Sequence, residues 1–277
     1  MILFSKLKIG IYFLLILFSC ELGKPKLIKD LPDSLKELSA AEVIEGTNIV
    51  WSVEDSGHDP IVYGFDTKTG ELLKTLEVKN AKNEDWEDLT SDKKGNLYVG
   101  DFGDSRGKKD DYIIYKLNDI LNADQTIEAE KIVFTLPKKQ KRLDFEAFFI
   151  YKDFFYLFSK EHGTVPMFKI PNKVGEHEAK LVKTFKLDAK GTLITSADIN
   201  KDENEMVLLN HDQVWVLSNF TSEDFFSEEV RLIPLHHNTQ KEGVCYLTDQ
   251  TLLITDERSG GEGGNLYSLS LLEETKE

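Results

Sequence analysis

Short apolar or alternating runs, separated by turn-forming residues, follow one another along most of this chain. The first of them are Val50–Val53, Val62–Phe65 and Leu72–Val78, with Asp59-Pro60 and Asp66–Gly70 between them. Runs of this length bounded by Gly, Pro and Asp predict β-strands joined by tight turns. Further strands are predicted at Leu97–Val99, Tyr112–Leu117, Glu130–Leu136, Phe154–Ser159, Met167–Ile170, Lys180–Leu187, Met206–Leu209, Val214–Leu217, Val230–Leu235, Gly243–Leu247, Thr251–Thr255 and Asn265–Leu271. Only Asp33–Leu38 and Leu117–Leu121 look helical, and both are short, so the pattern predicts an all-β fold.

A longer pattern, in which an acidic residue and a hydrophobic step precede an aliphatic run, recurs five times. Glu42, Glu87, Glu146, Ser196 and Glu242 take the same place in the five copies, at intervals of about 45 to 60 residues. An interval of this size, built from short strands, is typical of a β-propeller with one blade per repeat. The spacing therefore predicts five blades, and six remain possible because the second repeat is long.

The last repeat is incomplete. Only three strands are predicted after Glu242, and Lys26–Leu31 is the candidate for the fourth. An N-terminal strand in this place would close the ring and leave no open edge. No Pro/Ser-rich linker divides the chain, so residues 40–277 are predicted to form one propeller domain.

The N-terminus has the features of a targeting segment. Lys6 and Lys8 precede the apolar stretch Ile9–Phe18, which is short for a transmembrane helix. The residues Leu17-Phe18-Ser19-Cys20 resemble the lipobox of bacterial lipoproteins. We therefore expect a signal peptide over residues 1–19, and a lipidated Cys20, a tether and the closing strand over residues 20–39. The alternatives are an ordinary secretory signal and an uncleaved anchor.

The charge of the chain limits its partners. The formal net charge is −15 at pH 7, and 30% of the residues are charged. An acidic surface argues against nucleic acid as a partner, because phosphate binding depends on basic patches. A lipid anchor at Cys20 would instead place the protein in the cell envelope, on the periplasmic or the surface face of a bacterial membrane.

The repeated acidic residues are the candidate metal ligands. In a propeller they would converge on the central axis, where like charges repel unless a cation or water separates them. Calcium prefers six to eight oxygen ligands from several loops. The predicted metal set is Glu42, Glu87, Glu146, Glu242 and Asp198, the last because Ser196 breaks the acidic pattern. The alternative is that these carboxylates bind neighbouring backbone and hold the ring together.

A second set of polar residues follows about fourteen residues after each glutamate, at the end of the next strand. It comprises Asp101, Lys160 and Asp256, with Asp55 and His211 within one residue of that offset, and the loops beyond add Arg106, His162 and Arg258. Carboxylates with a few cations suit a phosphate or carboxylate ligand bound through calcium. They suit salt bridges between blades equally well. The sequence has no nucleophile elbow, phosphate-binding glycine loop or zinc-type histidine pair.

Three of these motifs resemble a known family. Asp85-Trp-Glu-Asp-Leu, Leu143-Asp-Phe-Glu-Ala147 and Gln240-Lys-Glu-Gly-Val244 are similar to motifs of the SdiA-regulated family of bacterial propellers, which is related to the phytase-like and esterase-like propellers. The resemblance implies a calcium-binding propeller outside the cytoplasm, with Glu87, Glu146 and Glu242 at the ion. A propeller by itself implies no activity.

Three functions are compatible with these observations. The first is a lipid-anchored envelope propeller whose acidic, calcium-binding funnel binds an unknown small molecule or envelope protein. The second is a calcium-dependent hydrolase of a phosphoester or lactone. The third is a structural scaffold without a small-molecule site.

Overall fold

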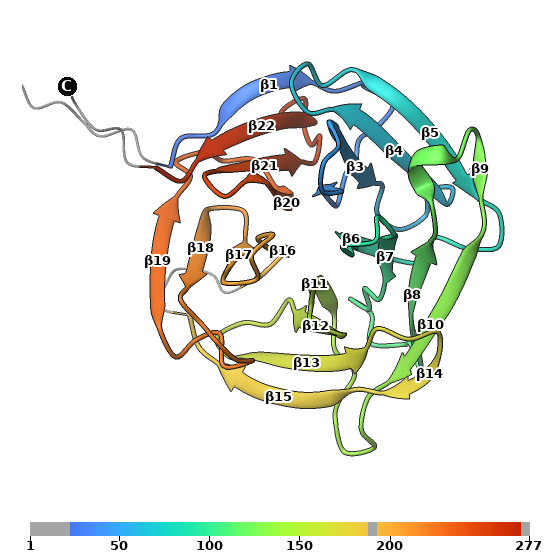
Figure 1. The fold of residues 1–277 in the computed structure, drawn as a ribbon, viewed down its shortest axis with the longest axis vertical. Helices are drawn as coiled ribbons and strands as arrows, with labels where there is room; N and C mark the ends of the chain where they lie inside the picture. Colours follow the sequence, from blue (N-terminus) through green and yellow to red (C-terminus); the bar gives the residue numbers. More distant parts are fainter. Residues whose placement is uncertain (1–22, 188–192, 273–277) are drawn as a thin grey trace, which may run out of the picture.

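A computed structural model describes residues 23–187 and 193–272 of the 277-residue chain, and these residues form a five-bladed β-propeller. Five sheets surround a central axis, and the four main strands of each pair antiparallel (Figure 1). The prediction of an all-β, five-bladed propeller is confirmed. The six-bladed alternative is wrong, because the extra residues of the long second repeat form loops and the short strand β9 (Thr126–Ile127).

The blades follow the chain in order. Blade 1 contains β2 (Glu42–Val43), β3 (Ile49–Val53), β4 (Ile61–Asp66) and β5 (Leu72–Val78), and blade 2 contains β6 (Trp86–Ser91), β7 (Leu97–Asp101), β8 (Tyr112–Leu117) and β10 (Ala129–Thr135). Blade 3 contains β11 (Phe145–Tyr151), β12 (Phe154–Ser159), β13 (Val165–Pro171) and β15 (Lys180–Phe185). Blade 4 contains β16 (Ser196–Ile199), β17 (Glu205–Leu209), β18 (Gln213–Ser218) and β19 (Glu229–Pro234).

Blade 5 joins the two ends of the chain. It contains β20 (Lys241–Thr248), β21 (Thr251–Asp256) and β22 (Asn265–Ser270), and β1 (Lys26–Asp30) pairs antiparallel with β22 as the outermost strand. The prediction that an N-terminal strand closes the ring is thus confirmed (Figure 1). All the described strands lie between Lys26 and Ser270, so a chain that starts at residue 21 carries the complete ring.

Two short strands extend a blade into its neighbour. β9 pairs parallel with β5, and β14 (Gly175–Glu178) pairs parallel with β10, so segments of blades 2 and 3 each add a strand to the preceding blade. The described helical structure is a single 3-10 turn, Ile120–Asn122. Neither described stretch of the chain contains a helix that is long and apolar enough to cross a membrane.

The core lies between neighbouring blades. Side chains that point out of each sheet meet those of the next sheet, because successive residues of a strand face opposite sides. Phe149 of β11 and Trp215 of β18 belong to one buried cluster of blades 3 and 4, and Trp51 and Trp86 belong to one of blades 1 and 2. Burial of a large side chain contributes about 2 kcal/mol or more. The apolar runs of the sequence therefore become the interfaces that hold the ring.

Candidate functional site

Three of the predicted glutamates meet at one end of the central channel. Glu87, Glu146 and Glu242 are each the second residue of an innermost strand, and each lies at a β-bulge where the register with the second strand shifts by one residue. A bulge re-aims the side chain of the extra residue. We call this end the carboxylate mouth and define it by Asp55, Glu87, Glu146, Glu242 and Glu257.

The backbone next to each bulge brings a second ring of side chains to the same mouth. The amide N–H groups of Asp55, Lys160 and Glu257 donate to the carbonyls of Glu37, Asp144 and Gln240, at the entry to the respective innermost strand. Lys160 and Glu257 are the first residues after the second strand of their blades, and Asp55 is the second. They therefore occupy equivalent places, although one is a cation and two are acids.

In blade 2 the corresponding place belongs to a glycine. The N–H of Gly103 donates to the carbonyl of Asp85, and a Cβ at Gly103 would lie 2.1 Å from Glu87 Oε1 and 2.7 Å from Asp85 Cγ. Any side chain here would displace both carboxylates. Gly103 thus opens the space in which the two carboxylates lie.

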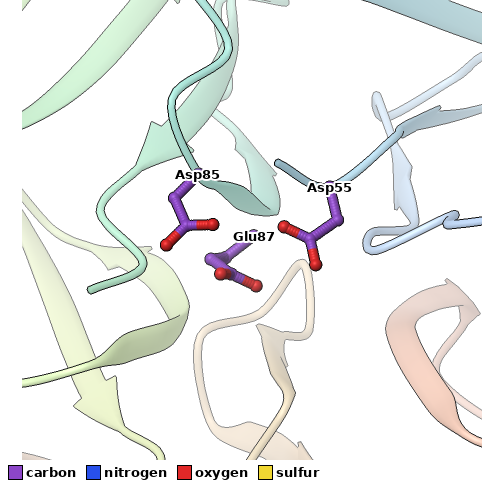
Figure 2. A group of neighbouring side chains, drawn as sticks. All are labelled: Asp55, Asp85 and Glu87. Carbon is purple, nitrogen blue, oxygen red and sulfur yellow. The ribbon is translucent and has the colours of Figure 1, made fainter. Parts of the chain in front are cut away.

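Asp55, Asp85 and Glu87 form the tightest acidic group of the described residues. One oxygen from each lies within 4.8 Å of one from each of the others. Figure 2 shows the three carboxylates converging, with Asp55 coming from the end of blade 1 and the other two from blade 2. Three oxygens in one such group suit a hard cation.

The central glutamates differ in their partners. Lys160 Nζ donates to Glu146 Oε2 at 2.8 Å, and His211 Nε2 lies 2.9 Å from Glu242 Oε1. Glu87 is only 8% exposed, and in the described parts of the chain its carboxylate has neither a hydrogen bond nor an ion pair. A buried carboxylate without a partner is costly unless it is protonated or binds a cation. Among the described residues of this mouth, Glu87 is thus the glutamate without a hydrogen bond or an ion pair, although the charge of Lys160 acts on it.

The pKa values reflect this crowding. Burial, and then the charges of Glu146 and Asp55, raise the pKa of Glu87 well above its usual value. Burial raises the pKa of Glu146 to about 8, against the opposing effect of Lys160, and burial and Asp55 raise that of Asp85 to about 6. Burial alone would lower the pKa of Lys160, but Glu146 and Glu242 raise it above its ordinary value, so this amine stays charged. Burial and mutual repulsion thus favour the protonated forms of these acids more than in a free carboxylic acid.

Two of the five predicted metal ligands lie elsewhere. In blade 1 the innermost segment begins with Leu38, which bridges to Glu54, and in blade 2 it begins with Trp86, which pairs with Asp101. Glu87 follows Trp86 by one residue, whereas Glu42 follows Leu38 by four. A shift of three residues along a strand is about 10 Å. The equivalence of Glu42 with the other glutamates is therefore wrong, because the strand register is set by pairing and bulges that the spacing of acidic residues does not reveal.

Asp198 lies with Glu42 at the opposite end of the channel. Both line the same cavity, and the charge of Asp198 contributes to the raised pKa of Glu42 after burial itself. In the fourth repeat Ser196 takes the place of the repeated glutamate. It pairs with Leu209, and no bulge interrupts the register of this strand. Blade 4 therefore contributes His211 to the carboxylate mouth rather than a glutamate.

The predicted ligand-binding residues divide in a similar way. Lys160 and His211 reach the central glutamates, while Arg106 and His162 are exposed on their loops. Asp101 and Asp256 are buried: Asp101 Oδ1 accepts from Asp85 N and Lys109 Nζ, and Asp256 accepts from Asn265 N and Tyr267 Oη.

Arg258 binds the closing strand rather than the carboxylate mouth. Its Nη2 donates to Leu31 O at 2.9 Å and to Asp30 Oδ1, next to the closing strand.

Cys20 lies outside the described residues, so its lipidation remains a prediction. Asp55 and Asp85 were not predicted as metal ligands. The repeated Asp-aromatic-Glu of Asp85-Trp86-Glu87 and Asp144-Phe145-Glu146 nevertheless marks an acid two residues before each of these glutamates.

Comparison with known proteins supports the fold. No protein-family model matches the sequence, and no curated protein matches it. Among solved structures, the PQQ-bound aldose sugar dehydrogenase of Streptomyces coelicolor is similar, with a TM-score of 0.53 and 8% identity over 89% of this chain and 98% of that one. A gluconolactonase of Xanthomonas campestris has a TM-score of 0.49 and 10% identity over 89% of each chain. The Cps50 (Swd1) propeller domain of Myceliophteria thermophila has a TM-score of 0.47 and 9% identity, over 85% of this chain and 97% of that one.

Proposed function

We propose that this protein is a lipid-anchored propeller of the bacterial cell envelope whose carboxylate mouth binds calcium and, through the ion, a small molecule or an envelope protein. The main support for this proposal is the environment of Glu87. Its buried carboxylate has no hydrogen bond or ion pair within the described residues, and it lies close to the carboxylates of Asp55 and Asp85. The motif resemblance to the SdiA-regulated propellers supports the same assignment for Glu87.

The chemistry of the three ligands favours calcium. Asp55, Asp85 and Glu87 supply oxygen and no nitrogen or sulfur, as a hard cation requires. Calcium tolerates irregular geometry and binds carboxylates in one- or two-oxygen modes, whereas magnesium demands a near-ideal octahedron. The remaining positions would be open to water or to an anionic group of the ligand.

Thermal unfolding tests the calcium site. For the chain from residue 21 onward, adding millimolar calcium after EDTA should raise the midpoint, because an ion that binds the folded state selectively stabilises it. At one hundred times Kd the gain is about 2.7 kcal/mol. Glu87→Gln should abolish the rise. Glu228→Gln, the same change at an exposed position, should leave it intact.

If calcium raises the unfolding midpoint of neither the wild type nor Glu228→Gln, the central glutamates act as structural clamps and the scaffold function is favoured. If magnesium shifts the midpoint as much as calcium, the site is a general divalent-cation site.

A calcium-dependent hydrolase is the second candidate, and a specific observation favours it. His211 and Lys160 lie beside the central glutamates, where a base and a cation could act on a substrate held by the ion. Turnover of p-nitrophenyl phosphate or γ-butyrolactone should then require calcium. His211→Asn should abolish this turnover and keep the calcium-dependent rise in midpoint, and turnover that survives in His211→Asn would refute this role of the histidine.

A further inference from the structure

The opposite end of the channel contains a cavity of about 560 Å³, and all five blades contribute to its lining. Here hairpin turns connect the innermost strands to the second strands, so we call this end the turn mouth. Its floor is formed by the last part of the innermost strands, with Glu42, Ser91, Ile150, Asp198 and Tyr246 taken in blade order. Ligand sites commonly have volumes of about 300 to 1,000 Å³.

The two mouths are separate sites. Between them Asp88 is fully buried, and it accepts hydrogen bonds from Phe148 N of blade 3 and from Ala197 N of blade 4. The described residues that line the cavity include none of the carboxylates of Asp55, Glu87, Glu146 or Glu242. A ligand in the turn mouth would therefore not touch an ion in the carboxylate mouth.

Two buried acids define the floor of the cavity. Glu42 is 4% exposed and Asp198 is 7% exposed. Glu42 Oε1 accepts a hydrogen bond from Ser91 Oγ at 2.5 Å. Burial and the charge of Asp198 raise the pKa of Glu42, and burial raises that of Asp198 to about 7. A protonated Glu42 offers both a donor and an acceptor to a ligand.

The rim of the cavity carries opposite charges that compensate one another. Lys201 Nζ lies 2.5 Å from Glu45 Oε1, and Lys93 Nζ lies 2.7 Å from Glu203 Oε1. Each pair joins the hairpin turns of two different blades. Paired lysines are poor anchors for a phosphate, because binding would require an existing ion pair to break. A neutral ligand would leave both ion pairs intact, although the lining also contains Lys94 and Lys152.

The floor is also poorly suited to a metal ion. Both oxygens of Asp198 already accept backbone hydrogen bonds, Oδ1 from Ile199 N and Oδ2 from Tyr246 N, each at 2.7 Å. Among the described residues, the group of three carboxylates close enough to share an ion lies at the other mouth. The cavity presents hydrogen-bonding groups instead, from Glu42, Ser91 and the amide of Asn172.

We propose that the turn mouth is a second ligand site, for a neutral, hydroxyl-rich molecule of the size of a mono- or disaccharide. The volume of the cavity, its buried polar floor and the two ion pairs on its rim support this site. It goes beyond the calcium site and does not depend on it. Hydroxyl groups both donate and accept, so they match a protonated acid and amides better than an ion or an apolar ligand does.

Saturation-transfer difference NMR tests the proposal with the chain from residue 21 onward. The probes are glucose, N-acetylglucosamine, maltose and cellobiose at millimolar concentration. At least one should bind. Asp249→Trp, a change at an exposed rim residue, should fill the entrance and weaken binding about tenfold or more without disturbing a buried group.

Two further variants separate a neutral ligand from a charged one. Glu42→Leu should weaken sugar binding about tenfold, whereas Glu42→Gln keeps a donor and an acceptor and should stay within about threefold. Glu87→Gln, at the other mouth, should bind as the wild type does. The proposal is overturned if none of the four sugars binds, or if binding survives both Asp249→Trp and Glu42→Leu. It is also overturned if n-butylamine binds in their place and Glu42→Gln abolishes that binding.

Discussion

Ser196 donates a hydrogen bond from its Oγ to Asp88 Oδ1 at 2.9 Å, and this bond crosses the centre of the propeller from blade 4 to blade 2. Both side chains are fully buried. Ser196 Oγ in turn accepts from Val244 N of blade 5, and Asp88 Oδ2 accepts from Phe148 N of blade 3. These two side chains therefore connect four of the five blades around the axis.

Asp88→Ala should destabilise the ring by about 3 kcal/mol. The change leaves the N–H groups of Phe148 and Ala197 and the hydroxyl of Ser196 without their acceptor, and each unsatisfied buried group costs about 1 to 3 kcal/mol. Removal of a buried charge offsets part of this cost. Urea unfolding followed by tryptophan fluorescence measures the loss. Asp124→Ala, at an exposed position, should change the free energy of unfolding by less than about 0.5 kcal/mol.

In EDTA, stability should fall as the pH rises from about 5 to 8. The folded-state pKa values of Glu146, about 8, and Asp198, about 7, exceed their ordinary values, so in this window the folded state binds more protons than the unfolded state does. The stabilisation is complete below the unfolded pKa values of about 4, and it is lost as the pH rises through the folded pKa values. Since each group contributes up to about 1.4 kcal/mol per pH unit between its two pKa values, a decrease of about 5 kcal/mol is expected in urea unfolding.

The double variant Glu146→Gln, Asp198→Asn provides the control for this pH dependence, and its stability should vary less over the same window. If calcium replaces protons at the carboxylate mouth, the calcium-dependent rise in midpoint should be larger at pH 8 than at pH 5.5. A wild-type stability that increases from pH 5 to pH 8 in EDTA would contradict the buried, protonated carboxyl groups.

Gly103→Ala should remove calcium binding without a change in any ligand. The new Cβ would meet Glu87 Oε1 at 2.1 Å and force the carboxylate away from Asp55 and Asp85. We expect a loss of the calcium-dependent rise in midpoint, and overpacking that costs about 1 to 3 kcal/mol. Gly107→Ala is the matched control: no heavy atom lies within 4 Å of a Cβ there, so this variant should keep calcium binding despite the strain of its positive φ.

Arg258→Ala should loosen the closing strand. The guanidinium donates to Leu31 O and to Asp30, and Asp30 is too exposed for the ion pair alone to matter much. Loss of the bond to the carbonyl should cost about 1 kcal/mol. Hydrogen exchange of Lys26–Asp30 should accelerate, whereas Lys79→Ala, which breaks an exposed pair with Glu77, should leave that exchange unchanged. Equal exchange in the two variants would mean that β1 is held by its pairing with β22 alone.

The fold could be predicted because its signals are local and periodic. Alternating runs such as Leu72–Val78 reappear as strands with the same bounds, and Asp66–Gly70 reappears as a turn. The closing strand followed from counting, since three strands after Glu242 required a fourth. Apolar patterning and turn chemistry depend on neighbouring residues, which the sequence displays directly.

The site could be predicted only in part. The spacing of Glu87, Glu146 and Glu242 brought three true neighbours together, because their blades share the same one-residue bulge. The same reasoning failed for Glu42, because it pairs with Trp51 and so lies three residues further along its strand than Glu87 does, at the far mouth. A shift of one residue in register reverses the face of every side chain that follows it.

The amino-acid sequence thus determined the number of blades, the order of the strands and the residue types available around the axis. Only the tertiary structure decided which carboxylates meet. It paired Glu146 with Lys160 and Glu242 with His211, left Glu87 with Asp55 and Asp85, and divided the acids between two mouths. The reason is physical: strand patterns are set by neighbours along the chain, whereas contacts at the axis depend on bulges and on the packing of five blades that are far apart in sequence.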